Sequence, residues 1–387
     1  MLDKLCNTRT IINMFRGLMV NFFPTILLFR YLSTKLAARF FSKKQLHKYK
    51  FGVSFSKMIS YVQSLILAVI FFASVAQANN DSDKKIFKVY VNQLVEHPAL
   101  DATTKGVIDG LSEAGYQQDK NLDLQVEIAQ GNMALASQIS ARFASKKPDI
   151  VVGVATLSAQ SLAKYAKKEE TRLVFTTVTD PLKAGLVETL VNPGNNITGV
   201  SNYIELEPQI ELFMKIKPSI KKLGFLYNPG ELNSLSILEQ LKIVCSKYGI
   251  KVIGITANKT SEVPQSATRL SSEVDAIFIS NDNTALSAIK SIIKAANGQQ
   301  IPVFVSDTDI VEDGAIAALG PNQYELGKQT GFLIARILNG EDIKKISVEF
   351  PKKTELFLNQ KAASQLNIVL PTELISIADK VFHSDSP

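Results

Sequence analysis

The sequence contains few of the residues that bind metals or form cross-links. Cysteine occurs only as Cys6 and Cys245, so the chain after residue 78 has a single thiol and cannot form an internal disulfide. No Cys-x-x-Cys pair is present, and histidine occurs only as His47, His97 and His383. Acidic residues are not spaced as in a calcium-binding loop. We therefore expect neither a metal site nor a cofactor.

Motifs of covalent catalysis and of phosphate binding are also missing. No Gly-x-Ser-x-Gly elbow surrounds Ser158, and neither a P-loop nor a Gly-x-Gly-x-x-Gly fingerprint occurs. A Ser-His-Asp triad could draw only on His97, whose segment EHPALD is typical of a turn or a rim. A hydrolase that uses Ser158 and His97 is thus the weaker hypothesis, and we expect a protein that is not an enzyme.

The positive charge of the chain is confined to its beginning. The whole sequence has a formal net charge of +7, but residues 1–57 contain eleven Lys and Arg against the single acid Asp3. The rest of the chain carries 32 basic and 35 acidic residues and is therefore slightly acidic. A nucleic-acid partner is not expected, because such a partner requires a basic surface on the folded part.

Residues 58–78 have the order of a secretory signal peptide. Lys57 precedes Met58, the apolar core LILAVIFFA follows, and the segment ends in Ala76-Gln77-Ala78. This order predicts cleavage after Ala78 and a periplasmic protein. An uncleaved membrane anchor is the alternative, although the apolar run is shorter than the roughly 20 residues that span a bilayer. We therefore expect translation to start at Met58 and regard residues 1–57 as a doubtful N-terminal extension. Alternatively, the segment MVNFFPTILLFRYL within it associates with a membrane.

After this segment, short β-branched runs alternate with amphipathic helical windows. In the first series we expect strands at 84–93, 121–130, 148–155 and 172–178, and helices at 100–116, 133–147 and 158–170. NPGNNITGVSN, residues 192–202, breaks the rhythm. A second series follows, with helices at 207–218, 234–249, 263–272 and 284–298 and strands at 221–228, 250–257, 274–280 and 301–307. The pattern predicts an α/β protein with two similar doubly wound parallel-sheet lobes.

The last part of the chain adds elements that fit a chain crossing between the lobes more than once. They are a strand at 314–320, a helix at 322–340, and the segments KISVEF and ELFLNQKAASQLNIVLP. We assign residues 84–203 and 315–345 to lobe 1, and residues 204–314 and 346–380 to lobe 2. The lobes would hinge near residues 200–205, 310–320 and 343–348.

Small polar side chains gather where the predicted strands end, which is where open parallel sheets bind ligands. Thr156 and Ser158 open a helix, so their hydroxyls and the first amides could hold an anion such as a carboxylate. They could equally act as an N-cap that serves only the helix. Asp282, Asn283 and Asp307 in the other lobe could receive an ammonium group. Together these residues indicate a clamp for an amino acid.

Several motifs resemble one known family in order and spacing. They are VEHPALD, AQGN, VATLSAQSLA, FTTVTDPLKAGLV, NPGNNITGVSN, GFLYNPGELNS, ISNDNT, GAIAALGPNQYELGKQTG and ILNGED. Over residues 84–375 the chain is similar to ABC transporter substrate-binding proteins of the tryptophan/tyrosine type. The resemblance implies a type I periplasmic-binding-protein fold, three crossovers between the lobes, closure on an amino acid that is aromatic or related, and delivery to a membrane permease.

The resemblance also implies which positions line the cleft. In lobe 1 they are Gln93, Glu96, His97, Thr156, Ser158, Gln160, Thr177, Thr179 and Asp180, and in lobe 2 they are Asn228, Glu231, Asn233, Asp282, Asn283 and Asp307. Two of them have structural alternatives, because Asp180 precedes a proline and could stabilise a turn, and Glu231 could cap a helix. The chain has no tryptophan, so any ring that stacks on the ligand would be Tyr203 or Tyr227, which could equally pack between the lobes.

One rival remains beside the hydrolase. A sensory receptor of the same fold would feed a signalling partner instead of a permease, and such a partner leaves no mark in this sequence. A sugar-responsive repressor is less consistent with the chain, because a signal peptide stands where its DNA-binding helices would be.

Overall fold

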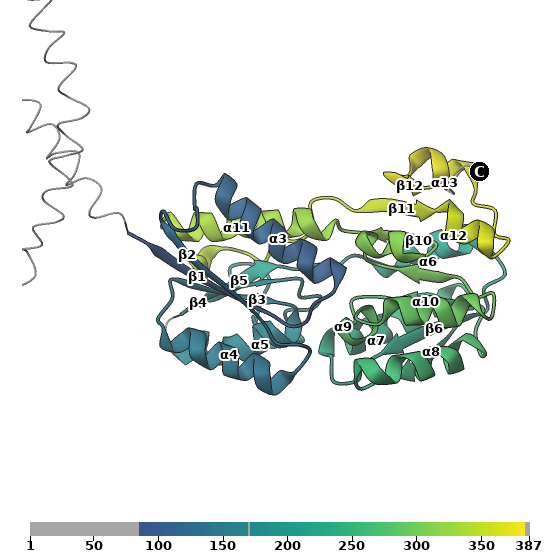
Figure 1. The fold of residues 1–387 in the computed structure, drawn as a ribbon, viewed down its shortest axis with the longest axis horizontal. Helices are drawn as coiled ribbons and strands as arrows, with labels where there is room; N and C mark the ends of the chain where they lie inside the picture. Colours follow the sequence, from purple (N-terminus) through teal and green to yellow (C-terminus); the bar gives the residue numbers. More distant parts are fainter. Residues whose placement is uncertain (1–84, 169–170, 384–387) are drawn as a thin grey trace, which may run out of the picture. The chain divides into compact units, whose positions relative to one another are not determined.

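Two sheets of mainly parallel strands, each covered by helices on both faces, organise the computed structural model of the protein (Figure 1). The structure describes residues 85–168 and 171–383. The expected signal peptide and the N-terminal extension lie outside these residues. Within the described residues, no helix has the length and apolar character needed to cross a bilayer.

The first lobe contains a five-stranded parallel sheet with strand order β2-β1-β3-β4-β5. Apolar side chains on one face pack against α3 and α11, and those on the other face pack against α4 and α5. Its strands are β1 (Phe87–Gln93), β2 (Leu122–Ile128), β3 (Ile150–Val154), β4 (Arg172–Thr176) and β5 (Ile197–Val200), and its helices are α3 (Pro98–Glu113), α4 (Met133–Ser145), α5 (Thr156–Lys168) and α11 (Gln323–Leu338).

The second lobe contains a seven-stranded sheet with order β12-β11-β10-β9-β8-β6-β7, in which only the β10–β11 pair is antiparallel. Helices α6, α7 and α12 cover one face, and α8, α9 and α10 cover the other. The strands are β6 (Lys222–Tyr227), β7 (Lys251–Thr256), β8 (Ala276–Ile279), β9 (Val303–Val305), β10 (Ala317–Gly320), β11 (Glu355–Asn359) and β12 (Lys380–Phe382). The helices are α6 (Leu206–Ile216), α7 (Leu232–Lys247), α8 (Val263–Ser271), α9 (Asn283–Leu286), α10 (Ile289–Asn297), α12 (Gln360–Gln365) and α13 (Thr372–Ile377), with 3₁₀ turns at Thr260–Glu262, Thr308–Asp313 and Ile343–Lys345.

The chain passes between the two sheets in three connections, at residues 201–205, 321–322 and 351–354. Two expected lobe boundaries were therefore wrong. Strand β10 pairs with β9 and β11, so residues 315–320 belong to lobe 2. Residues 346–350 stay with lobe 1, because Val348 packs in its core and Glu349 N–H donates to Gly199 O. The expected break at 192–202 also contains strand β5.

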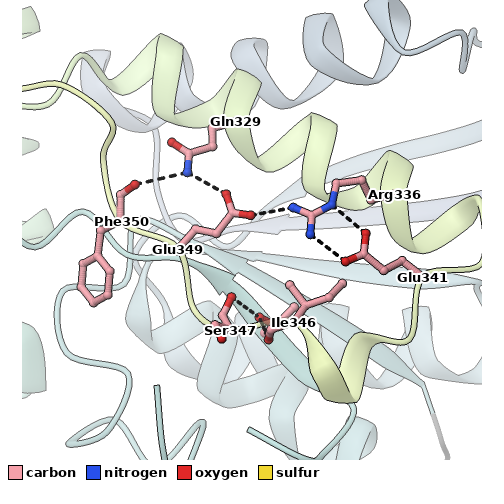
Figure 2. A network of polar contacts seen from close by, with 8 residues as sticks. Gln329, Arg336, Glu341, Ile346, Ser347, Glu349 and Phe350 are labelled. Atoms are coloured by element: carbon pink, nitrogen blue, oxygen red, sulfur yellow. Dashed lines mark hydrogen bonds and ion pairs between the residues drawn. The ribbon is translucent and has the colours of Figure 1, made fainter. Parts of the chain in front are cut away.

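Polar and charged side chains of α11 bind the segment that follows this helix as far as Phe350 (Figure 2). Arg336 binds Glu341 through two hydrogen bonds of 2.7 Å and Glu349 through a third of 2.7 Å. Gln329 Nε2 donates to Glu349 Oε2 at 2.7 Å and to Phe350 O at 3.2 Å. Glu341 and Glu349 are each held by two hydrogen bonds, and Phe350 is held by one. The segment that connects to lobe 2 therefore begins only after Phe350.

Helices α3 and α11 pack so closely that glycine is required at their crossing. A Cβ on Gly106 would lie 2.1 Å from Tyr324 O, and a Cβ on Gly327 would lie 2.1 Å from Thr103 O. These spacings leave no room for a methyl group, so the two backbones contact each other directly. The N-termini of both helices reach the space between the lobes, as described below.

Candidate ligand-binding site

The carboxyl ends of the strands of both lobes face one another across a small cavity, which we call the inner chamber. Its lining residues are His97, Ala99, Leu100, Thr177, Asn202, Asn281, Asn283, Leu286, Asp307 and Gln323. The cavity volume is about 20 Å³, slightly more than the roughly 10–15 Å³ that one water molecule needs. A larger ligand can therefore enter only if side chains or lobes move apart.

Two non-glycine residues at the strand ends of lobe 1 have left-handed backbone conformations. Ala155, after β3, has φ +76°, and Thr177, after β4, has φ +55°. For a β-branched residue this conformation is a genuine outlier and costs about 1–3 kcal/mol. Ala155 N–H donates to Thr177 Oγ1 at 3.1 Å, and this hydroxyl donates to Thr176 O at 2.7 Å. Strain held in place by such bonds is typical of a functional site.

Helix α5 begins at this strained turn without a side-chain cap. The residue before it, Ala155, has no side-chain oxygen, unlike His97, Asn132, Asp282 and Asn322, whose side chains cap α3, α4, α9 and α11. Helices α6, α7, α8 and α10 likewise begin without a side-chain cap. The first amides of α5 have no intrahelical acceptor. Thr156 Oγ1 is buried and has no hydrogen-bond partner. These unused donors, with the positive end of the helix dipole, can bind an anion.

Asp307 supplies a buried carboxylate from the opposite lobe. Burial, and secondarily the charge of Asp309, raise the pKa of Asp307 to about 7. Gln323, the first residue of α11 in lobe 1, donates its Nε2 hydrogen to Asp307 Oδ1 across the lobes. The Oε1 of Gln323 is buried without a partner. The inner chamber therefore offers two acceptor groups to a cation or a hydrogen-bond donor.

His97 and Asn283 form a second contact between the lobes. Leu100 N–H donates to His97 Nδ1 at 3.4 Å, so the Nε2–H of the neutral ring donates to Asn283 Oδ1 at 3.3 Å. Burial lowers the pKa of His97 to about 4, and the ring is uncharged at neutral pH. His97 thus caps α3 and contacts lobe 2, and among the described residues it has no hydrogen bond to Ser158 that would form a catalytic pair.

Residues near the first connection form further contacts between the lobes. Thr179 Oγ1 donates to Asn202 Oδ1 at 3.1 Å and accepts from Asn281 Nδ2 at 3.2 Å. Asp180 accepts from Lys183 N–H at 3.0 Å, as expected for a turn residue, and also from Ser236 Oγ of lobe 2 at 2.9 Å. Thr179 and Asp180 therefore join the lobes beside the chamber.

Of the nine predicted positions of lobe 1, only His97 and Thr177 line the inner chamber. Thr156, Thr179 and Asp180 lie outside it, and so do four others. Gln93 is buried and bonded to Asp101 and Thr104, and Ser158 Oγ donates to Asn92 Oδ1 at 3.4 Å inside the lobe. Gln160 Nε2 donates to Ala184 O at 2.9 Å. Glu96 is exposed to solvent. Of the two hydroxyls at the start of α5, Thr156 is the one left without a partner.

In lobe 2, Asn228, Glu231, Asn233 and Asp282 form a network around the start of α9. Glu231 accepts hydrogen bonds from the amides of Asn283 and Thr284, both at 3.0 Å, which confirms the alternative that it caps a helix. Asp282 accepts from Asn228 N–H at 2.6 Å and from Ala285 N–H at 2.7 Å. Burial, and then the charge of Glu231, raise the pKa of Asp282 to about 7. Asn233 Nδ2 donates to Asn281 O at 2.6 Å. This network shapes the loop that carries Asn281 and Asn283.

Sequence reasoning missed six residues of the chamber, namely Ala99, Leu100, Asn202, Asn281, Leu286 and Gln323. Asn281 adjoins the predicted pair Asp282 and Asn283, and Gln323 lies three residues after the end of β10, so both carried the signal that located the others. Tyr203 and Tyr227 are not part of the chamber. Tyr203 OH donates to Gln240 Oε1 at 3.0 Å, and Tyr227 stacks on Phe225.

The two α/β lobes, the three connections and the polar chamber between the strand ends define a two-lobed ligand-binding protein with the type I periplasmic-binding-protein fold. The family model of the ABC transporter substrate-binding proteins matches residues 88–382. The chain belongs to this family.

Several relatives are similar over most of the chain. A tyrosine-binding protein of Clostridioides difficile strain R20291 is 31% identical, over 81% of this chain and 92% of that protein. A solved domain protein of Vibrio cholerae is 43% identical with a TM-score of 0.75, covering 77% of this chain and 100% of that one. An ABC domain of Streptococcus pneumoniae in complex with L-Trp is 32% identical with a TM-score of 0.74, at the same coverage.

A ligand-free, open substrate-binding protein from Clostridium difficile gives a lower TM-score of 0.59, although its identity of 33% and its coverage of 77% and 100% are similar. Equal coverage at a lower score indicates a different arrangement of similar lobes. As a whole, this structure is thus more similar to the tryptophan complex than to the open structure.

Proposed function

We propose that the protein is the exported receptor of an ABC importer and that it closes its two lobes around an amino acid, most suitably an aromatic one. The observation that carries this proposal is the opposite polarity of the two sides of the cleft. Lobe 1 presents the uncapped start of α5, which carries the buried, unpartnered Thr156 hydroxyl and reaches a cavity between the lobes at the next residue, Leu157, and lobe 2 presents the carboxylate of Asp307. An α-carboxylate suits the first and an α-ammonium suits the second.

Contacts between the lobes would stabilise a closed form. His97, Thr179, Asp180 and Gln323 of lobe 1 all bond to residues of lobe 2. A ligand that adds contacts to both lobes increases the preference for this form by its differential affinity for the two states. The three connections can then act as the hinge that the sequence predicts, although at somewhat different residues.

The named relatives support an aromatic ligand, since one is called a tyrosine-binding protein and another was solved with L-Trp. The lining residues of the inner chamber include no Phe or Tyr, so ring recognition must rely on His97, Leu100 and Leu286 or on surfaces farther out.

Export to the periplasm, cleavage after Ala78 and delivery to a membrane permease complete the proposal. They are supported by the signal-peptide pattern of residues 58–78 and by membership of the family. Mass spectrometry of the natural protein tests the first part. A mature N-terminus at Asn79 is expected, and peptides that precede Met58 would contradict a start at that residue.

Isothermal titration calorimetry tests the ligand. L-Trp, L-Tyr and L-Phe should release or absorb heat with one site per chain, and branched amino acids should bind more weakly. Because the chain lacks tryptophan, the fluorescence of bound L-Trp can be followed without background. Absence of binding by every amino acid would remove the clamp hypothesis, and turnover of an ester or amide would favour the hydrolase instead.

A further inference from the structure

A second, larger cavity lies between the lobes, and we call it the outer chamber. Its volume is about 280 Å³, near the lower end of the roughly 300–1,000 Å³ of small-molecule sites. Leu94, Val95 and Leu157 of lobe 1 line it, as do Asn258, Lys259 and Ser261 of lobe 2. It is thus built from both lobes, and it reaches the start of α5 at Leu157.

The two walls of the outer chamber differ in chemistry. On lobe 1, Leu94, Val95 and Leu157 form an apolar, at least partly buried patch beside the exposed Gln130 and Gly131. The lobe 2 wall is polar throughout, with the exposed Asn258, Lys259 and Ser261 and the buried Glu231 among its residues. Within residues 85–168 and 171–383, the ammonium group of Lys259 pairs only with Glu262, at the long distance of 3.8 Å, so it is available to the chamber. A ligand group that fits between these walls has an apolar body and a polar tip.

The inner and outer chambers meet at Asn283, which lines both. Its Oδ1 accepts the 3.3 Å hydrogen bond of His97 Nε2, a neutral contact near the long end of the usual range. On the inner side, Gln323 Oε1 is buried without a partner beside Asp307. The inner chamber accommodates a group the size of a water molecule or an ammonium ion and nothing larger.

We propose that one ligand occupies both chambers and takes the place of the His97–Asn283 hydrogen bond. Its α-ammonium lies in the inner chamber beside Asp307 and Gln323, and its side chain extends into the outer chamber. The ligand class is therefore an α-amino acid with a long side chain, apolar along its length and polar at its end. This inference rests on the proposed amino-acid function and adds the placement of the side chain.

Blocking the outer chamber tests this placement. Ser261→Trp fills the chamber from an exposed position, so the fold should tolerate it, and Thr268→Trp places the same ring on the exposed face of α8 as a matched control. Calorimetry with L-Tyr should show at least tenfold weaker binding for Ser261→Trp and unchanged binding for Thr268→Trp. Equal affinity of both variants and the natural protein would overturn the two-chamber placement while leaving amino-acid binding intact. Failure of the natural protein to bind L-Tyr and L-Trp would overturn both proposals.

Nuclear magnetic resonance of the imidazole nitrogens tests the exchanged hydrogen bond. With three histidines in the chain, the His97 signals can be assigned from the spectrum of a His97→Asn variant. Saturating L-Tyr should shift the Nε2 signal of His97 and leave that of His383 unchanged. An unchanged His97 signal at saturation would show that the ligand does not replace this contact.

Discussion

Buried polar atoms without partners mark the cleft at the scale of single residues. Leaving a buried hydroxyl or amide oxygen unpaired costs about 1–3 kcal/mol, so few are tolerated in a folded protein. The described residues contain five such atoms, on Thr156, Asn233, Thr308, Asp309 and Gln323. Gln323 lines the inner chamber, Thr308 and Asp309 follow its lining residue Asp307, and Thr156 is the first residue of α5. We interpret this loss of stability as the consequence of a site shaped for a ligand.

Thr156→Val tests this interpretation, because valine keeps the shape and removes the unpaired hydroxyl. We expect the free energy of unfolding to stay the same or rise by about 1 kcal/mol, while amino-acid affinity falls about tenfold. Thr104→Val is the control, since its hydroxyl donates to Gln93 Oε1 at 2.6 Å inside lobe 1. The control should lose stability and keep its affinity. Urea unfolding and calorimetry measure both quantities, and an unchanged affinity of Thr156→Val would argue against the anion site.

Asp307 should make binding depend on pH. Its pKa is about 7 because burial disfavours the charged form, but an ammonium group requires that charged form. Binding below pH 7 must therefore release a proton, and affinity should fall about tenfold for each pH unit below 7 and stay constant above it. His97, with a pKa of about 4, remains neutral in this range.

Asp307→Asn should bind amino acids at least tenfold more weakly at pH 8 and should lose this pH dependence. Asp313→Asn, at the other end of the same 3₁₀ turn, is the control, because its ion pair with Lys290 lies on the surface. Calorimetry between pH 5 and 8 in two buffers counts the released protons. No proton release at pH 6 would contradict a direct contact between Asp307 and the ammonium group.

At the scale of elements, the crossing of α3 and α11 supports the site from behind. The two helices contact each other through backbone atoms at Gly106 and Gly327, and their first residues carry the Leu100 and Gln323 groups that line the chamber. A rigid pair of this kind fixes the positions of both side chains relative to lobe 2.

Gly327→Ala should therefore destabilise the protein by about 1–3 kcal/mol, although alanine normally favours a helix. The new methyl group would meet Thr103 O, a backbone atom that cannot move away by itself. Gly298→Ala is the control, because its nearest neighbour, Ala295 O, would be 3.5 Å away. Urea unfolding measures the difference, and equal stability of the two variants would show that the crossing can relax.

The alternation of strands and helices was largely predictable from local periodicity, but the pairing of strands was not. The apolar sequence of strand β10 would suit a buried position in either sheet. Its place in lobe 2 is set by its pairing with β9 and β11, which local periodicity does not reveal. Strand β5 is four residues long and follows a run of Asn, Pro and Gly that indicates a loop.

The location of the site was also predictable, because polar residues follow parallel strands. The roles of its residues were not. Thr156 and Ser158 are two positions apart and so lie about 200° apart around α5, which turns one toward the lobe interior. Glu231 and Asp282 looked like ligand carboxylates, but both accept hydrogen bonds from amides at the start of α9. Asp282 is the N-cap of this helix, whereas Glu231 is 52 residues away from Asn283 in sequence, so sequence alone does not bring it near.

At the scale of the whole molecule, the account requires that the lobes move. The inner chamber of about 20 Å³ cannot admit an amino acid in the present arrangement. The four contacts between the lobes, which His97, Thr179, Asp180 and Gln323 make with lobe 2, must therefore break when the ligand enters and form again afterwards. The lower similarity to the open relative agrees with such a motion. Binding and closure are then one coupled equilibrium.

The distance between the lobes during ligand addition tests this central claim most directly. Spin labels on Gln138→Cys in α4 and Gln265→Cys in α8 occupy exposed positions of the two lobes, while the native Cys245 is buried. Pulsed dipolar spectroscopy should show longer and broader distances without amino acid, and one shorter, narrow distance with saturating L-Trp or L-Tyr. A distribution that no amino acid changes would contradict closure around such a ligand.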